Sequence, residues 1–141
     1  MANTKQPELN LNTPQAELGK VELYKLNYNT TRGQLYEHLR DLSVDDVIDE
    51  SDQLAKSHGI YLEYNRAKTG REKDWTFMVR ISIPGGGDMD KKQWAVIDDL
   101  ATRYSVNPEG QPSIRLTTRQ NIQFHWVKKE NLIDLVKTIA S

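Results

Sequence analysis

The segment from Ser113 to Trp126 constrains the fold of this chain more than any other. Its even-numbered positions are mainly apolar, whereas its odd-numbered positions are all polar. This alternation is typical of a β-strand with one buried face and one polar face. These residues, fully extended, would span roughly 45 Å, well beyond a usual strand of about five or six residues. Because Thr118 and Gln120 interrupt the apolar face, we expect a bend, a bulge or a turn between two strands there.

The chain from residue 75 onward alternates between strand and helix patterns. Residues 75–83 repeat the period of two and end at a run of glycines at 85–87. A helix pattern follows, in which Trp94 and Tyr104 are expected to lie in the core, and another helix begins near Glu130. The order strand, helix, strand, strand, helix indicates an α+β, split βαβ sandwich that still needs a fourth strand. Either residues 60–64 supply that strand or the sandwich is incomplete.

The N-terminal half has a different character. Residues 1–20 contain prolines and no apolar period, and we expect them to form a disordered lead. Leucines at helical spacing predict a short helix within residues 31–42. A second helix is expected to begin at Ser43, paired with Asp46 in a capping interaction, and to end at Gly59. The sequence therefore predicts a helical segment over residues 21–59, followed by the sandwich over residues 60–141.

Composition excludes several classes of function. The 141 residues include no cysteine, so this chain supplies no disulfide, no cysteine-ligated zinc site and no thiolate ligand for an iron–sulfur cluster. Its net charge of -1 gives no overall field that attracts nucleic acid or anionic membranes. No stretch approaches the roughly 18 apolar residues of a membrane span, and the N-terminal residues lack the apolar centre of a secretory signal. We therefore expect a cytoplasmic protein that binds neither nucleic acid nor membrane.

The polar face of residues 113–126 consists of hydrogen-bond donors. Arg115 and Arg119 stand in line with amides, hydroxyls and His125, with no acid among them. Arginine binds carboxylate or phosphate through two parallel charge-assisted bonds, and amides and hydroxyls complete the remaining oxygens of an anion. The row, which Arg80 of the preceding strand can join, favours an anion-binding face. The pattern equally permits a solvated sheet face whose arginines pair with acids elsewhere.

Three blocks of the sequence resemble the N-terminal ferredoxin-like half-domain of the sirohaem-containing sulfite and nitrite reductases. They are FMVRISIPGGG at 77–87, KKQWAVIDDLA at 91–101 and SIRLTTRQNIQFHWV at 113–127. HGIYLEYNR at 58–66 is also similar to that family's N-terminal region, so the resemblance covers about residues 21–141. It implies a ferredoxin-like half-domain, preceded by N-terminal helices, that contacts the carboxylates of sirohaem. The contact residues that it implies are Arg80, Arg115, Thr117, Thr118, Arg119, Gln123 and His125.

The same resemblance implies an enzymatic function. The family couples sirohaem to a 4Fe-4S cluster and reduces sulfite to sulfide, or nitrite to ammonia, with six electrons. The cluster cysteines and a second half-domain are absent here, so we expect a segment that is inactive alone. It would need the remaining C-terminal part of the reductase or a partner chain. The resemblance leaves open the choice between sulfite and nitrite, and whether ferredoxin or an NADPH-dependent flavoprotein donates electrons. Ser82 stands where many members have Arg or Lys, which puts substrate handling by this segment in question.

Two other functions fit parts of the pattern. An RNA-binding module of the RRM type shares the strand-helix-strand order, but its aromatic motif is missing, and Phe124 and Trp126 are expected on the helix-packing face. A half-domain that kept the fold and lost the cofactor is the other alternative. His38 and His58 are expected on the surface, and no histidine or acid spacing indicates a metal site. The glycines at 85–87 lack the spacing of a nucleotide-binding loop.

Overall fold

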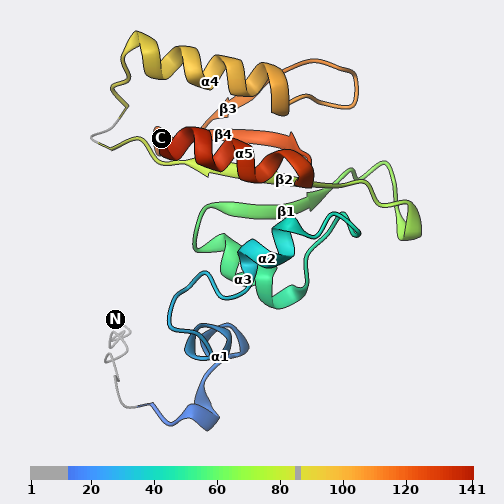
Figure 1. Ribbon diagram of the computed structural model, residues 1–141, viewed down its shortest axis with the longest axis vertical. Coiled ribbons are helices and arrows are strands. Elements are labelled where there is room, and N and C mark those ends of the chain that lie inside the picture. The colour runs from blue at the N-terminus through green and yellow to red at the C-terminus, as the bar shows by residue number, and fades with distance from the viewer. Residues whose placement is uncertain (1–12, 85–86) are drawn as a thin grey trace, which may run out of the picture.

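The computed structural model describes residues 13–84 and 87–141, which form a four-stranded sheet with helices beside it (Figure 1). Residues 1–12, most of the expected N-terminal lead, lie outside the described part. The elements in chain order are a 3-10 turn at Gln15–Glu17, α1 (Lys20–Leu26), α2 (Leu35–Arg40), α3 (Asp49–Lys56), β1 (Ile60–Tyr64), a 3-10 turn at Gly70–Glu72, β2 (Trp75–Ile81), α4 (Lys91–Tyr104), β3 (Ile114–Leu116), β4 (Ile122–Val127) and α5 (Lys129–Ala140).

The sheet has the strand order β1-β2-β4-β3, and all neighbouring strands are antiparallel. β2 and β3 are therefore parallel to each other, with β4 between them and α4 as their connection, which is the split βαβ arrangement. β1 supplies the fourth strand from the N-terminal side, so the first of the two alternatives for residues 60–64 holds. The expected interruption at Thr118 and Gln120 is the hairpin turn between β3 and β4.

Helices cover one face of the sheet. α5 lies over β2 and β4, and α4 lies beyond it towards β3 (Figure 1). The alternating apolar residues of the strands point into this layer, where Phe77 and Phe124 have no exposed surface. Leu100 of α4 and Leu132 of α5 are equally buried against them. The burial of each such side chain contributes about 1.5–3 kcal/mol, which fixes which strand face is inside.

Two expectations about the helices are wrong. α3 begins at Asp49 rather than Ser43, because the backbone N–H and hydroxyl of Ser43 both donate to the carboxylate of Asp41 in a local turn. Trp94 lies on the solvent side of α4 with 46% of its surface exposed. The buried stripe of that helix runs through Ile97 instead, because the contact between helix and sheet is narrower than its apolar pattern.

Candidate functional site

The face of the sheet opposite α4 and α5 carries the predicted polar side chains. Gln123, on β4, pairs with Arg80 of β2 on one side and with Arg115 of β3 on the other. Directly paired residues point to the same face, so the three side chains form a row across three strands. Strands lie about 4.8 Å apart, so this row is roughly 10 Å long. The predicted common face for Arg80, Arg115 and Gln123 is confirmed.

A chain of hydrogen bonds crosses this face from β2 to β1. The Gln123 amide is oriented by its neighbours, so that its oxygen accepts from Arg80 Nε at 3.2 Å and Nη2 at 2.9 Å, and its nitrogen donates to His125 Nε2 at 3.1 Å. The other ring nitrogen, His125 Nδ1, lies 3.3 Å from Oε2 of Glu63 on β1. The Arg80 guanidinium also lies 5.5 Å from the ring centre of Tyr61, its neighbour on β1. Arg80, Gln123, His125 and Glu63 thus form one connected group, which we call the relay.

Glu63 is the acid that the strand pattern did not predict on this face. The hydrogen bond from His125 lowers the pKa of the Glu63 carboxyl below its usual range, whereas partial burial raises it. The charges of Arg115 and Arg66 lower this pKa further. The Glu63 side chain remains 41% exposed. The face therefore holds one carboxylate among its cations, and His125 is the group that engages it.

A cavity of about 570 Å³ opens on this side of the sheet. Glu63, Arg66, Arg115, His125 and Trp126 are among the residues that line it. Among the described residues that line it are the guanidinium groups of Arg66 and Arg115 and one carboxylate, that of Glu63.

Trp126 reaches this cavity because β4 contains a bulge. The pairing of Phe77 with Val127 and of Val79 with Phe124 leaves one extra residue on β4, and Trp126 has a positive φ of 64°. The expectation that Trp126 lies on the helix-packing face is therefore wrong, whereas Phe124 is in the core as expected. The sequence argument against an RNA-binding face that rested on the two aromatics now holds for Phe124 alone, and the missing aromatic motif remains the other argument.

The other predicted residues lie in the hairpin turn and not in the row. Thr117 begins the turn, and its hydroxyl oxygen accepts hydrogen bonds from the backbone N–H groups of Arg119 at 3.3 Å and Asn121 at 3.2 Å. Thr118 and Arg119 are exposed at the tip. The expected row of donors is thus divided at the expected turn: Arg115 and Gln123 lie on paired strands, whereas Arg119 lies in the turn between them. Arg115 and Arg119 have no ion pair with any acid in the part of the chain that the structure describes.

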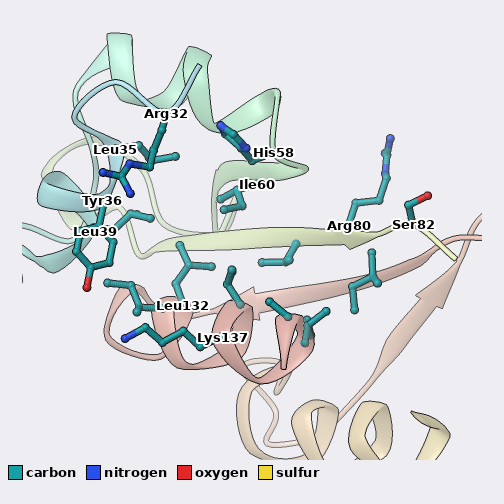
Figure 2. A pocket seen from close by; sticks show the side chains of 16 residues that line it. Arg32, Leu35, Tyr36, Leu39, His58, Ile60, Arg80, Ser82, Leu132 and Lys137 are labelled. Atoms are coloured by element: carbon teal, nitrogen blue, oxygen red, sulfur yellow. The ribbon is translucent and has the colours of Figure 1, made fainter. Parts of the chain in front are cut away.

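A second cavity, of about 540 Å³, lies on the opposite side, between α2, β2 and α5. Its lining is mainly apolar, with Arg32 and Lys137 among its few charged residues (Figure 2). Figure 2 shows Arg80 pointing away from Leu132 and Lys137, and Ser82 lies near it at the end of β2. Arg80 is one of the residues that line this cavity, but its guanidinium lies beside the Gln123 amide on the open face.

The part of the chain that the structure describes contains neither a metal-binding cluster nor a membrane-spanning helix. Among the described residues, no group of three or more His, Cys, Asp or Glu side chains is placed to hold a metal ion. No helix in residues 13–84 and 87–141 is long and apolar enough to cross a membrane. His58 is exposed, as expected, and its Nε2 lies 3.3 Å from the carbonyl oxygen of Thr31. His38 is only partly exposed, and its Nδ1 hydrogen-bonds with the hydroxyl of buried Ser51.

Comparison with known proteins gives the family. Residues 70–141 match the sequence model of the nitrite/sulfite reductase ferredoxin-like half domain. The sulfite reductase [NADPH] hemoprotein beta-component of Bacillus subtilis is 33% identical over 137 residues, which are 93% of this chain and 23% of the relative. That of Bordetella petrii is 37% identical over 82% of this chain and 20% of the relative. The chain thus spans less than a quarter of the length of these relatives.

The fold has a counterpart among solved structures. The NirA protein of Mycobacterium tuberculosis matches with a TM-score of 0.67 over 87% of this chain and 24% of the other, at 19% identity. At that identity the likeness concerns the fold, and it agrees with the split βαβ sheet described above. The matched half domain and the relatives that are more than 30% identical show that this chain belongs to the nitrite/sulfite reductase family.

Proposed function

We propose that this chain is the sirohaem-facing segment of a sulfite or nitrite reductase that also depends on a 4Fe-4S cluster. The observation that carries the proposal is the row of Arg80, Gln123 and Arg115 across the open face of the sheet. No helix of the described part covers that row, and Arg115 has no internal acid as an ion-pair partner there. The names of the relatives favour sulfite as the substrate and an NADPH-linked donor as the source of electrons.

The chemistry of the row fits a ligand fringed with carboxylates. A guanidinium has five N–H donors, and two of those of Arg80 are used by Gln123, which leaves three for a ligand. Arg115 is exposed and lines the cavity. Bidentate arginine–carboxylate contacts are the strong ones, so Arg80 and Arg115 would hold two carboxylates on opposite sides of Gln123. Arg119 and Thr118, at the exposed tip of the hairpin, would close over the edge of the same ligand.

The chain's own residues would bind and orient the cofactor rather than perform electron transfer. When bound, sirohaem would be the centre at which the substrate receives electrons that an external donor provides. Arg80 and Arg115 would fix its position through their carboxylate contacts, and Trp126 would shield one side of the cavity from water. The cluster's thiolate ligands must come from outside these 141 residues, which contain no cysteine. We therefore expect the chain to act together with the remaining part of the reductase or a partner chain, and to be inactive alone.

The test uses a complete reductase that carries this segment. We expect Arg115→Ala and Arg80→Ala to weaken sirohaem retention by about 10-fold to 100-fold each, since a hydrogen bond to a charged group contributes roughly 1.5–3 kcal/mol. Retention is measured by sirohaem absorbance per protein after dialysis. Arg71→Ala, in the exposed turn at 70–72, is the matched control and should retain the cofactor. Full retention in both site variants, with unchanged helical content, would overturn the proposal.

The isolated chain offers a second test. Supplied with sirohaem and a chemical reductant, the 141-residue protein should produce no sulfide from sulfite and no ammonia from nitrite. Turnover by the chain alone would contradict its assignment as a segment. Absence of sirohaem even in the complete reductase would favour the half-domain that lost its cofactor. Salt-dependent RNA binding that Arg115→Ala abolishes would favour the RNA-binding alternative.

A further inference from the structure

The relay on the open face uses both ring nitrogens of His125 within the chain. Nδ1 faces the Glu63 carboxylate at 3.3 Å, and Nε2 faces the Gln123 amide at 3.1 Å. Only 12% of the His125 side chain is exposed. A ligand on the open face therefore meets an imidazole whose hydrogen-bonding atoms are already engaged.

The groups at the two ends of the relay select one arrangement of protons. Arg80 has only donors, so the Gln123 oxygen must face it and the Gln123 NH2 group must face His125. His125 Nε2 then has to accept, so it is unprotonated and the ring proton is on Nδ1. That proton points at Glu63, which as a carboxylate only accepts. In the reverse orientation, NH2 would face the guanidinium of Arg80.

We infer that His125 is a positioning residue rather than a ligand contact: Glu63 holds it in the Nδ1–H tautomer, and through Gln123 it directs the guanidinium of Arg80. Glu63 is then the residue that organises this face before any ligand arrives. The identity of the anion that Arg80 receives rests on the proposed function, whereas the relay does not.

The first test is the tautomer of His125 in the 141-residue chain, read from ¹⁵N–¹H correlation spectra at a pH where the imidazole is neutral. We expect protonated Nδ1 and unprotonated Nε2 in the wild type. Glu63→Ala should shift His125 towards the Nε2–H tautomer, and Glu63→Gln should preserve Nδ1–H because its amide oxygen still accepts. An Nε2–H tautomer in the wild type, or no change in Glu63→Ala, would overturn the inference. The wild-type measurement decides even where a variant does not fold.

The second test follows the far end of the relay. Hydrogen exchange of Arg80 Nε–H should accelerate by about fivefold in Glu63→Ala and in His125→Ala, which is the expected loss of one ordinary hydrogen bond. Arg119 Nε–H, at the exposed tip of the hairpin, is the internal control and should not change. Unaltered exchange at Arg80 in both variants would refute the transmission through Gln123.

Failure of the relay and failure of the proposed function give different results. If the tautomer and exchange results hold while Arg80→Ala leaves sirohaem retention intact in the complete reductase, the relay stands and the proposed ligand is wrong. If Arg80→Ala releases sirohaem while the Glu63 variants change neither the tautomer nor the exchange, the ligand stands and the positioning role is wrong.

Discussion

Lys129 links the C-terminal helix to the N-terminal helical segment through a single buried ammonium group. It is the first residue of α5, and only 5% of it is exposed. Its Nζ donates to the backbone carbonyl oxygens of Asp41 at 2.7 Å, Val44 at 2.9 Å and Asp46 at 2.7 Å. We predict that Lys129→Met, which keeps the length of the side chain and removes the charge, substantially lowers the free energy of unfolding.

The expected loss in the free energy of unfolding combines one stabilising contribution with two that offset it. Each hydrogen bond from a charged donor contributes roughly 1.5–3 kcal/mol, so the three bonds together give about 4.5–9 kcal/mol before any cost is subtracted. Burial of the ammonium costs several kcal/mol, and this cost disappears in the methionine variant. Asp41 and Val44 lie at the surface, so water can replace part of what their carbonyl groups lose. We expect a net loss of about 2–4 kcal/mol.

Lys128 is the matched control, because it precedes Lys129 directly and differs in burial. Its ammonium pairs with Asp74 at the surface, and 47% of its side chain is exposed. Such pairs contribute about 0.2–1 kcal/mol, so Lys128→Met should have a small effect. Urea unfolding followed by far-ultraviolet circular dichroism measures both. Equal losses in the two variants, or a loss below about 0.5 kcal/mol for Lys129→Met, would refute the reasoning.

Two further predictions concern the backbone and the acid limb of stability. Gly59 has a φ of 73°, and a Cβ added there would lie 2.8 Å from the Arg80 carbonyl oxygen. Gly110 has a φ of 81°, but a Cβ added there would have no neighbouring atom within 4 Å. Gly59→Ala should therefore lower the urea midpoint more than Gly110→Ala does. Equal midpoints for the two variants would contradict a steric cause. The lowered pKa of Glu63 means that the folded state favours its ionised form, so this stabilisation is present above the usual carboxyl pKa and is lost as pH falls through the lowered value. Glu63→Gln should make the free energy of unfolding less dependent on pH below the usual carboxyl pKa. An unchanged pH dependence in that range would show that His125 does not stabilise the carboxylate.

The period-two pattern correctly predicted much of the candidate site. It placed Arg80, Arg115 and Gln123 on one face, because side chains alternate regularly wherever a strand is unbroken. The same rule failed where the backbone leaves regular geometry. Arg119 lies in the hairpin turn, which the polar interruption at Thr118 and Gln120 had indicated, whereas an unmarked bulge in β4 brings Trp126 to the cavity side. A one-residue insertion reverses every later position, and nothing in the local pattern marks it.

Local sequence therefore determined the strands, most of the helices, the buried face of the sheet and the resemblance that led to the family. The tertiary structure alone decided that Glu63 meets His125 and that Lys129 meets the carbonyl groups of residues 41, 44 and 46. The physical reason is that periodicity reports which side of an element a residue occupies, whereas partners distant in the chain are set by how strands order in the sheet. Here that order puts β1 beside β2 and β2 beside β4, which brings an acid from the N-terminal side onto a face of basic and amide groups.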